Sequence, residues 1–224
     1  MAVIIKPSDI EQNSMSIIAS ELEERGITLP PEHEAVVKRV IHTTADFDYA
    51  ETLRFTEGAV EKAVTALSGG CGIVTDTNMA KAGVSKPALK KLGGDVACFM
   101  ADPDVAAAAK KAGTTRAVMA MRHASKVAPK AVYAIGNAPT ALLQLAELIR
   151  ETDFRPALII GVPVGFVNVV ESKEELFRTC EEYGVPCIAA MGRKGGSNVA
   201  AAVCNALLYA AADLQNPEER NWKT

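Results

Sequence analysis

The chain has 224 residues, of which 49% are hydrophobic and 23% charged, and its formal net charge is −3. This composition is typical of a folded globular protein and excludes an intrinsically disordered chain. A mildly acidic protein has no general attraction for nucleic acid or for acidic membranes, although local basic clusters can still receive an anionic small molecule.

Residues 1–68 are predicted to be helical. A first helix is expected to begin near Pro7, because Ser8-Asp9-Ile10-Glu11 has the form of a capping box, and to end at Gly26. A second helix is expected from Pro31 to about His42, and a third from Glu57 to Leu67. The apolar positions of the first helix recur at roughly helical spacing: Ile10, Met15, Ile17, Ile18 and Leu22.

The second predicted helix ends in a polar segment, Arg39-Val-Ile-His42-Thr43-Thr44-Ala-Asp46. His42 is one of three histidines in the chain. An imidazole exchanges a proton near neutral pH, since its ordinary pKa is about 6.5. A histidine at a helix end is also a common surface or capping residue, so the residue type alone leaves both interpretations open.

Residues 69–214 alternate between short apolar runs and helical segments, which is typical of a parallel sheet covered on both faces. Right-handed crossovers then predict an α/β fold, a three-layer doubly wound parallel sheet of about five strands, in one domain over residues 1–224 with a polar tail at 215–224. The alanine-rich last helix, Asn198–Ala212, is apolar on so many faces that either it is buried in the core or part of it serves a dimer contact. The five predicted strands are Cys71–Thr75, Val96–Met100, Ala131–Ile135, Ala157–Val162 and Cys187–Ala190.

In such a sheet, ligands bind at the carboxyl ends of the strands, and the loops there are rich in glycine, amides and hydroxyls. Glycine lets a backbone approach a ligand closely, and free N–H groups at a helix start favour an anionic oxygen. Ordinary turns and helix caps use the same residue types, but several such loops on one rim, together with Arg193 and Lys194, favour a binding cleft. The loops begin at Asp76, Ala101, Gly136, Gly161 and Gly192.

The standard nucleotide and hydrolase motifs do not occur in the sequence. There is no Walker loop and no nucleophile elbow, and Gly70-Cys-Gly72 lacks the third glycine of a dinucleotide fingerprint. Gly192-Arg-Lys-Gly-Gly196 has the composition of an anion nest. The histidines are too far apart for a metal motif, so no metal site is expected.

The five cysteines are odd in number and widely spaced, and each lies in an apolar or alanine-rich run. This pattern indicates buried, reduced thiols and a cytoplasmic location. No signal peptide is expected, and the longest apolar run, Val199 to Ala212, is too short to span a bilayer.

Four segments together resemble the precorrin-8X methylmutase family, including its cobalt-precorrin-8 methylmutases. They are Arg39-Val-Ile-His42, Ala134-Ile-Gly-Asn-Ala-Pro-Thr-Ala-Leu142, Gly161-Val-Pro-Val-Gly-Phe-Val-Asn168 followed by Glu171-Ser-Lys-Glu174, and Gly192-Arg-Lys-Gly-Gly-Ser197. The resemblance covers nearly the whole chain in the right order, up to about Leu214.

The resemblance implies an isomerase of cobalamin biosynthesis that moves a methyl group from C11 to C12 of a contracted tetrapyrrole. The product is hydrogenobyrinate or, for the cobalt form, cobyrinate, and no external cofactor is needed because the migrating methyl is already on the substrate. It also implies a flavodoxin-like fold and a homodimer with the site at the subunit interface. His42 matches the catalytic histidine, and Arg39 and Ser14 match substrate-contacting residues, although Ser16 lies close to Ser14 in the sequence.

The substrate carries many carboxylates, which arginine grips through paired hydrogen bonds. Two further interpretations are a non-catalytic tetrapyrrole carrier, which would have no need of a proton-transferring His42, and a generic nucleotide-binding enzyme, against which the missing motifs count. The remaining expected substrate-binding residues are Thr43, Arg116, Gly136, Asn137, Gly165, Arg193 and Lys194.

Overall fold

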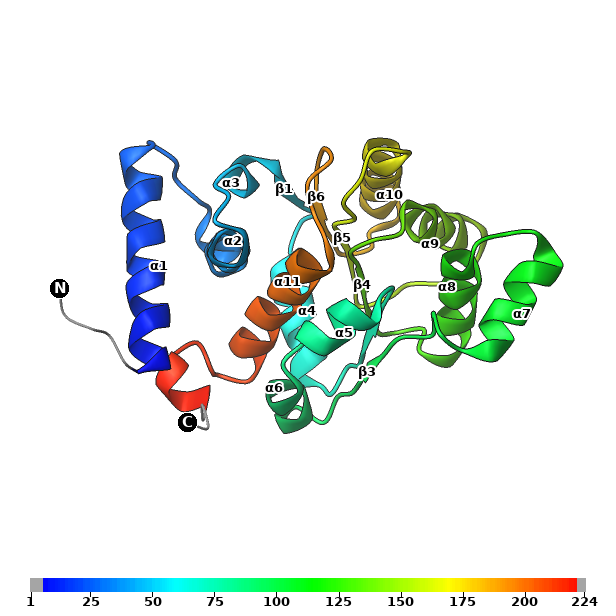
Figure 1. The fold of residues 1–224 in the computed structure, drawn as a ribbon, viewed down its shortest axis with the longest axis horizontal. Coiled ribbons are helices and arrows are strands. Elements are labelled where there is room, and N and C mark those ends of the chain that lie inside the picture. The colour runs from blue at the N-terminus through cyan, green and yellow to red at the C-terminus, as the bar shows by residue number, and fades with distance from the viewer. Residues whose placement is uncertain (1–5, 221–224) are drawn as a thin grey trace.

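The computed structural model describes residues 6–220, so residues 1–5 and the last four residues of the predicted polar tail, 221–224, lie outside the described residues (Figure 1). One six-stranded sheet lies at the centre. Its strands are β1 (Leu53–Phe55), β2 (Ile73–Thr75), β3 (Val96–Ala97), β4 (Val132–Ile135), β5 (Leu158–Gly161) and β6 (Cys187–Ala190). The helices are α1 (Pro7–Glu24), α2 (Pro31–Thr44), α3 (Tyr49–Thr52), α4 (Ala59–Ser68), α5 (Asn78–Gly83), α6 (Lys86–Lys91), α7 (Pro103–Ala112), α8 (Arg116–Val127), α9 (Pro139–Glu151), α10 (Val169–Tyr183), α11 (Ser197–Ala211) and the 3-10 helix η1 (Pro217–Arg220).

The sheet has the order β1-β6-β5-β4-β2-β3, and all pairs are parallel except β1 with β6. Numbered among themselves, the five parallel strands follow the order 2-1-3-4-5, which is that of flavodoxin-like folds. This confirms the predicted doubly wound α/β architecture. The sixth strand, β1, was not predicted: it runs antiparallel at the edge, where Leu53 pairs with Ala190.

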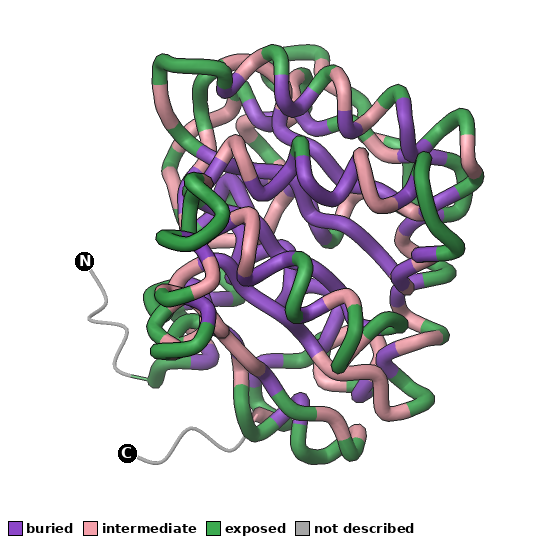
Figure 2. The backbone as a smooth tube through the Cα atoms, turned by 90° about the vertical axis from the view of Figure 1, so that its right-hand side faces the viewer, coloured by how far each residue is buried: buried purple, intermediate pink, exposed green. Residues whose placement is uncertain are grey.

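Side chains of the buried strands alternate between two hydrophobic clusters, as expected when both faces of a sheet are covered. Leu158 and Ile160 join one cluster with α2, α4 and α11, whereas Ile159 joins the other with α8, α9 and α10. Figure 1 shows the two groups of helices on either side of the strands, and in Figure 2 buried backbone runs through the middle of the molecule beneath a largely exposed periphery. The result is a three-layer core.

Helix α1 begins at Pro7, close to its predicted start, but it is capped differently from the prediction. The predicted capping box is wrong, because Pro7 is the first helical residue, Ser8 already lies inside the helix, and the Ser8 hydroxyl donates to Asp9. Glu11 therefore takes no part in a helix cap, and its side chain is buried. Ile10 and Ile17, which were expected on the apolar face, are each 51% exposed.

Helix α11 lies in the core, which was one of its two predicted locations. It packs against α2, α4 and α5, and residues such as Val199, Val203 and Leu207 are almost completely buried. Its small alanine side chains let these helices approach closely. At its N-terminus the chain leaves β6 through the Gly192–Gly196 loop, so α11 also fixes that loop.

No helix within residues 6–220 is long and apolar enough to cross a membrane. All five cysteines are free; three are buried, whereas Cys71 and Cys98 are only partly buried and so differ from the prediction.

Candidate active site

His42 lies in the last turn of α2 and faces α1. Helix α2 ends at Thr44, and Ala45 adopts the left-handed conformation that commonly closes a helix. The imidazole is partly buried, so it is held by the protein while remaining within reach of a ligand. The neighbouring Thr43 is exposed, and its hydroxyl donates to the Arg39 carbonyl within the helix.

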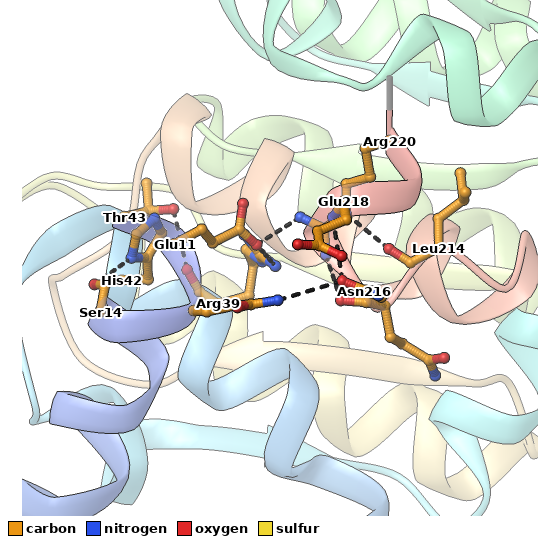
Figure 3. A network of polar contacts seen from close by, with 11 residues as sticks. Glu11, Ser14, Arg39, His42, Thr43, Leu214, Asn216, Glu218 and Arg220 are labelled. Atoms are coloured by element: carbon orange, nitrogen blue, oxygen red, sulfur yellow. Dashed lines mark hydrogen bonds and ion pairs between the residues drawn. The ribbon is translucent and has the colours of Figure 1, made fainter. Parts of the chain in front are cut away.

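Ser14 of α1 contacts this imidazole directly. The Ser14 hydroxyl lies 2.8 Å from His42 Nδ1, a hydrogen-bonding distance (Figure 3). The nearby Ser16, whose position in the sequence competes with Ser14, instead donates to the Gln12 carbonyl of its own helix. Ser14 therefore orients the ring and leaves Nε2 as the nitrogen that can meet a substrate.

One turn before His42, Arg39 is bound to a carboxylate. Arg39 Nη2 donates to Glu11 Oε1 at 2.5 Å, and the same oxygen accepts from Arg220 Nη1 at 2.5 Å (Figure 3). The side chains of Arg39 and Glu11 are only 14% and 8% exposed, so the ion pair is largely withdrawn from water. Within residues 6–220 the Arg39 guanidinium makes only this one hydrogen bond, which leaves N–H groups for a second anion.

Burial lowers the pKa of His42, and the positive charge of Arg39 lowers it further, whereas Glu11 partly offsets the two. This lowered pKa favours the neutral form of the imidazole at pH 7. Burial alone would raise the pKa of Glu11, but hydrogen bonds from Arg39 and Arg220 outweigh it, so the pKa of that carboxyl is lowered and Glu11 is ionised. The cluster thus carries two positive charges and one negative charge.

We expect His42 to titrate below its ordinary pKa of 6.5 in the folded, ligand-free protein. Between that lower pKa and 6.5 the unfolded chain binds more protons, so the histidine's contribution to stability is complete above pH 6.5 and is lost as the pH falls through the folded pKa. An NMR titration of the His42 imidazole resonances measures this directly. A midpoint at or above 6.5 would contradict the arrangement of charges described above.

The carboxyl ends of β2 and β4 are joined by Asp76, a buried residue that was predicted only as the start of a rim loop and was given no role. Its carboxylate accepts hydrogen bonds from three successive backbone N–H groups, those of Gly136, Asn137 and Ala138, each at 2.8 Å. Burial raises the pKa of Asp76, and the three donors oppose that shift. The sequence signal for Asp76 is its position directly after the first parallel strand. Strands β2 and β4 flank the point where the strand order reverses, which is where ligands bind in sheets of this kind.

The glycines of this rim have structural explanations. A Cβ on Gly136 would lie 2.7 Å from Ser197 Cα, so this glycine lets the β4 loop pack against the start of α11. Gly165 and Gly195 adopt positive φ angles of 152° and 158°. A Cβ on Gly195 would collide with the Val162 carbonyl. Close packing therefore accounts for Gly136 and Gly195 without a ligand, and substrate binding by Gly136 stays a prediction; Asn137 beside Gly136 is exposed.

The loops after β5 and β6 are joined to each other. Gly165 N donates to the Arg193 carbonyl at 3.2 Å, and the Arg193 guanidinium lies over the Phe166 ring, 5.6 Å from its centre. Phe166 and Val167 are 83% and 76% exposed. Arg193 forms no ion pair with any residue of the described range. The exposed Phe166 ring therefore lies beside a cation that has no ion-pair partner.

Lys194 has a different environment from Arg193. Its ammonium group lies 2.6 Å from Asp46 and 2.5 Å from Asp48, which bring the loop after β6 to the segment that follows His42. Hydrogen bonds to these two aspartates raise the pKa of Lys194. Lys194 is therefore already paired, and its evident role is to connect the His42 region with the rim of the sheet.

Lys173, another residue that sequence reasoning missed, lies beneath the same loop. It is fully buried and donates to the carbonyls of Gly192 and Lys194, each at 2.8 Å. Burial lowers its pKa to about 8. Two carbonyls of the Gly192–Gly196 loop thus bind an ammonium group of the protein, whereas the proposed anion nest concerns the N–H groups of the same loop and stays a prediction.

Arg116, the first residue of α8, is exposed and lies on the same rim but away from His42. The hydroxyl of the preceding Thr115 is 3.1 Å from that of Thr140 at the start of α9, which places Arg116 near the loop after β4. Figure 1 shows α8 and α2 on opposite sides of the sheet, and their buried residues belong to different hydrophobic clusters. One chain therefore brings together His42, Ser14 and Arg39, and separately Gly165 and Arg193, while Arg116 remains apart from the histidine.

Comparison with known proteins identifies the family. The sequence profile of precorrin-8X methylmutases matches residues 9–210. The chain belongs to the precorrin-8X methylmutase family.

Individual relatives support the assignment. The chain is 45% identical over 216 residues to the cobalt-precorrin-8 methylmutase of Salmonella typhimurium, covering 93% of this chain and 98% of that one. It is 42% identical over 203 residues to the cobalt-precorrin-8 methylmutase of Priestia megaterium, covering 91% and 88%. The solved structure of precorrin-8x methyl mutase from Thermus thermophilus superimposes with a TM-score of 0.81 at 40% identity, covering 91% and 98%.

The predicted family resemblance is thus confirmed. All residues expected to form the site of this precorrin-8X methylmutase family member lie within the matched range 9–210, as do Glu11, Asp76 and Lys173. Arg220, the second partner of Glu11, lies outside it.

Proposed function

We propose that this chain catalyses the C11-to-C12 methyl migration on precorrin-8X or cobalt-precorrin-8, giving hydrogenobyrinate or cobyrinate in cobalamin biosynthesis. The observation that carries the proposal is the Ser14–His42 hydrogen bond beside Arg39, in a chain that belongs to this family. The two relatives described above are named for the cobalt form, so we propose the cobalt complex as the natural substrate.

His42 acts as the proton donor and acceptor in this proposal. A methyl shift on a conjugated ring rearranges its double bonds, so a hydrogen bond or proton supplied to the ring system stabilises the transition state. Because Ser14 engages Nδ1, the opposite nitrogen Nε2 is directed at the macrocycle. The migrating group is already part of the substrate, so the protein's further task is to hold a large flat molecule in the reactive geometry.

The cations around the site receive the substrate carboxylates. Arg39 has unused N–H groups and Arg193 has no ion-pair partner in the described range, so we place substrate carboxylates on these two residues. Thr43, Asn137 and Gly165 are positioned to contact the periphery of the macrocycle. Lys194 is proposed to contribute positive potential, since Asp46 and Asp48 already occupy its ammonium group.

A homodimer with the site at its interface is also proposed. Large apolar side chains are exposed on the carboxyl rim, where a flat macrocycle and a second subunit would together cover them. Arg116, distant from His42 in one chain, would then serve the site of the other subunit. Exposed on this rim are Met79, Val164, Phe166 and Val167. We also propose a cytoplasmic location, which suits five free thiols.

Absorption spectroscopy tests the activity. Purified protein mixed with cobalt-precorrin-8, and separately with precorrin-8X, should convert the tetrapyrrole spectrum to that of the corresponding corrin. Faster conversion of the cobalt complex is expected. Tetrapyrrole that is bound but never converted would contradict the proposal and favour a carrier, and absence of binding would contradict both.

Replacing Arg39 with alanine is expected to weaken binding of the polycarboxylate about tenfold or more, because one charge-assisted interaction contributes roughly 1.5–3 kcal/mol. Fluorescence or absorption titration with the substrate measures the dissociation constant. Lys90→Ala, which removes an exposed cation from α6, is a matched control and should bind normally. An unchanged dissociation constant for Arg39→Ala would remove this residue from the binding site.

A further inference from the structure

The C-terminal segment folds back onto the first helix beside the histidine. Helix η1 packs against α1, and the Gln12 side chain donates to Asn216 at 3.3 Å (Figure 3). The family profile ends at residue 210, so this contact lies beyond the part of the chain that the family match describes.

Arg220 is the residue through which this segment reaches the site. Its Nε donates to the Leu214 carbonyl at 2.7 Å, Nη2 to the Gln215 carbonyl at 2.8 Å, and Nη1 to Glu11 at 2.5 Å. The guanidinium also lies over the Tyr209 ring, 3.8 Å from its centre, and the side chain is only 6% exposed. A buried arginine with every nitrogen engaged has a fixed position.

Glu11 is therefore held from two sides. Arg39 and Arg220 donate to the same oxygen, and the Arg39 guanidinium also lies over the Tyr209 ring, 5.3 Å from its centre. If Arg39 alone paired with Glu11, any movement of Arg39 toward a substrate carboxylate would leave a buried carboxylate without a cation, which is strongly unfavourable.

We propose that Arg220 is a positioning residue of the active site: it neutralises Glu11, so that Arg39 can bind a substrate carboxylate and His42 keeps its electrostatic environment. This inference rests on the proposed role of Arg39 in substrate binding. In this proposal the C-terminal segment supports the active site through Arg220, although none of its residues contacts the substrate.

The charges around His42 allow the role of Arg220 to be tested without substrate, through the pKa of His42. Glu11 and Ser14 face the imidazole from α1, Arg39 flanks it on α2, and Arg220 of η1 stands behind Glu11. Glu11 raises the pKa of His42 and Arg39 lowers it. Loss of Arg220 leaves the charge of Glu11 less compensated, so the pKa of His42 should rise.

The test compares Arg220→Gln, Arg220→Lys and a control, Arg178→Ala, which removes an exposed arginine paired only with Glu175. Arg220→Gln should raise the pKa of His42 in the substrate-free protein, measured by NMR, and raise KM about tenfold while kcat changes less than about threefold. Arg220→Lys, which keeps the charge, should restore most of both values. Arg178→Ala should change neither.

A folded Arg220→Gln protein with wild-type KM and an unshifted His42 would overturn the inference. If that variant does not fold, the pair Glu11→Gln and Glu11→Gln/Arg220→Gln carries the test, because the double variant leaves no carboxylate unpaired. The two should have the same KM, and a further tenfold loss in the double variant would show that Arg220 does not act through Glu11. A shifted His42 in a protein that converts no tetrapyrrole would overturn the proposed function while supporting the coupling of Arg220 to His42.

Discussion

Replacement of His42 with alanine is expected to lower kcat by about 10²–10⁴-fold, the usual contribution of a positioned general acid or base. The dissociation constant of the tetrapyrrole should change little, because the binding groups are cationic and lie on other residues. Single-turnover absorption measurements with saturating enzyme separate the two quantities. His123→Ala, which removes an exposed histidine packed edge-on against Phe99, is the matched control and should turn over normally.

Replacing Ser14 tests whether His42 has a chemical role or only a structural one. If Ser14 orients the imidazole, Ser14→Ala should lower kcat in the same direction as His42→Ala but by less, and should have little further effect in the His42→Ala background. Ser16→Ala, which removes only a hydrogen bond within α1, should have no effect. Turnover of His42→Ala within about tenfold of wild type would refute the assignment.

Replacement of Asp76 with asparagine is expected to lower the free energy of unfolding by about 2–4 kcal/mol, because a neutral amide cannot accept from three converging N–H groups and places a donor among them. Urea denaturation followed by circular dichroism measures the loss. The same change should raise KM, since the Gly136–Ala138 loop carries the exposed Asn137 on the rim.

A second aspartate provides the control for that experiment. Asp95 is exposed, and its carboxylate accepts a single backbone hydrogen bond, from the adjacent Val96 at 2.7 Å. Asp95→Asn should change the free energy of unfolding by less than about 1 kcal/mol. Equal effects of the two substitutions would show that the Asp76 contacts do not hold the loop.

Much of the fold follows from local patterns in the sequence. Each parallel strand is a continuous apolar run bounded by turn residues, and the strand Cys187–Ala190 was predicted with its observed bounds. Strand β1 had no such pattern, since its three residues include the exposed Arg54 and its structure depends on pairing with β6. A strand that depends on pairing with a segment far away in the sequence cannot be predicted from the local pattern of apolar residues.

The same limit applies to the site. His42 stands out as a histidine in the polar segment at the end of a predicted helix, and the family resemblance assigns roles to His42 and Arg39. Glu11 was read as part of a cap, whereas its partners Arg39 and Arg220 are 28 and 209 residues away. A carboxylate that serves a helix cap and one that serves a buried ion pair look alike in sequence, and only the folded chain distinguishes them.

The two outermost strands of the sheet are both short. The sheet ends on one side in β1, with three residues, and on the other in β3, with two. Such short margins offer few unpaired backbone groups on which another chain could extend the sheet. In the proposed homodimer, the subunits are therefore expected to associate through side chains of loops and helices, and each would keep its own sheet as a separate unit.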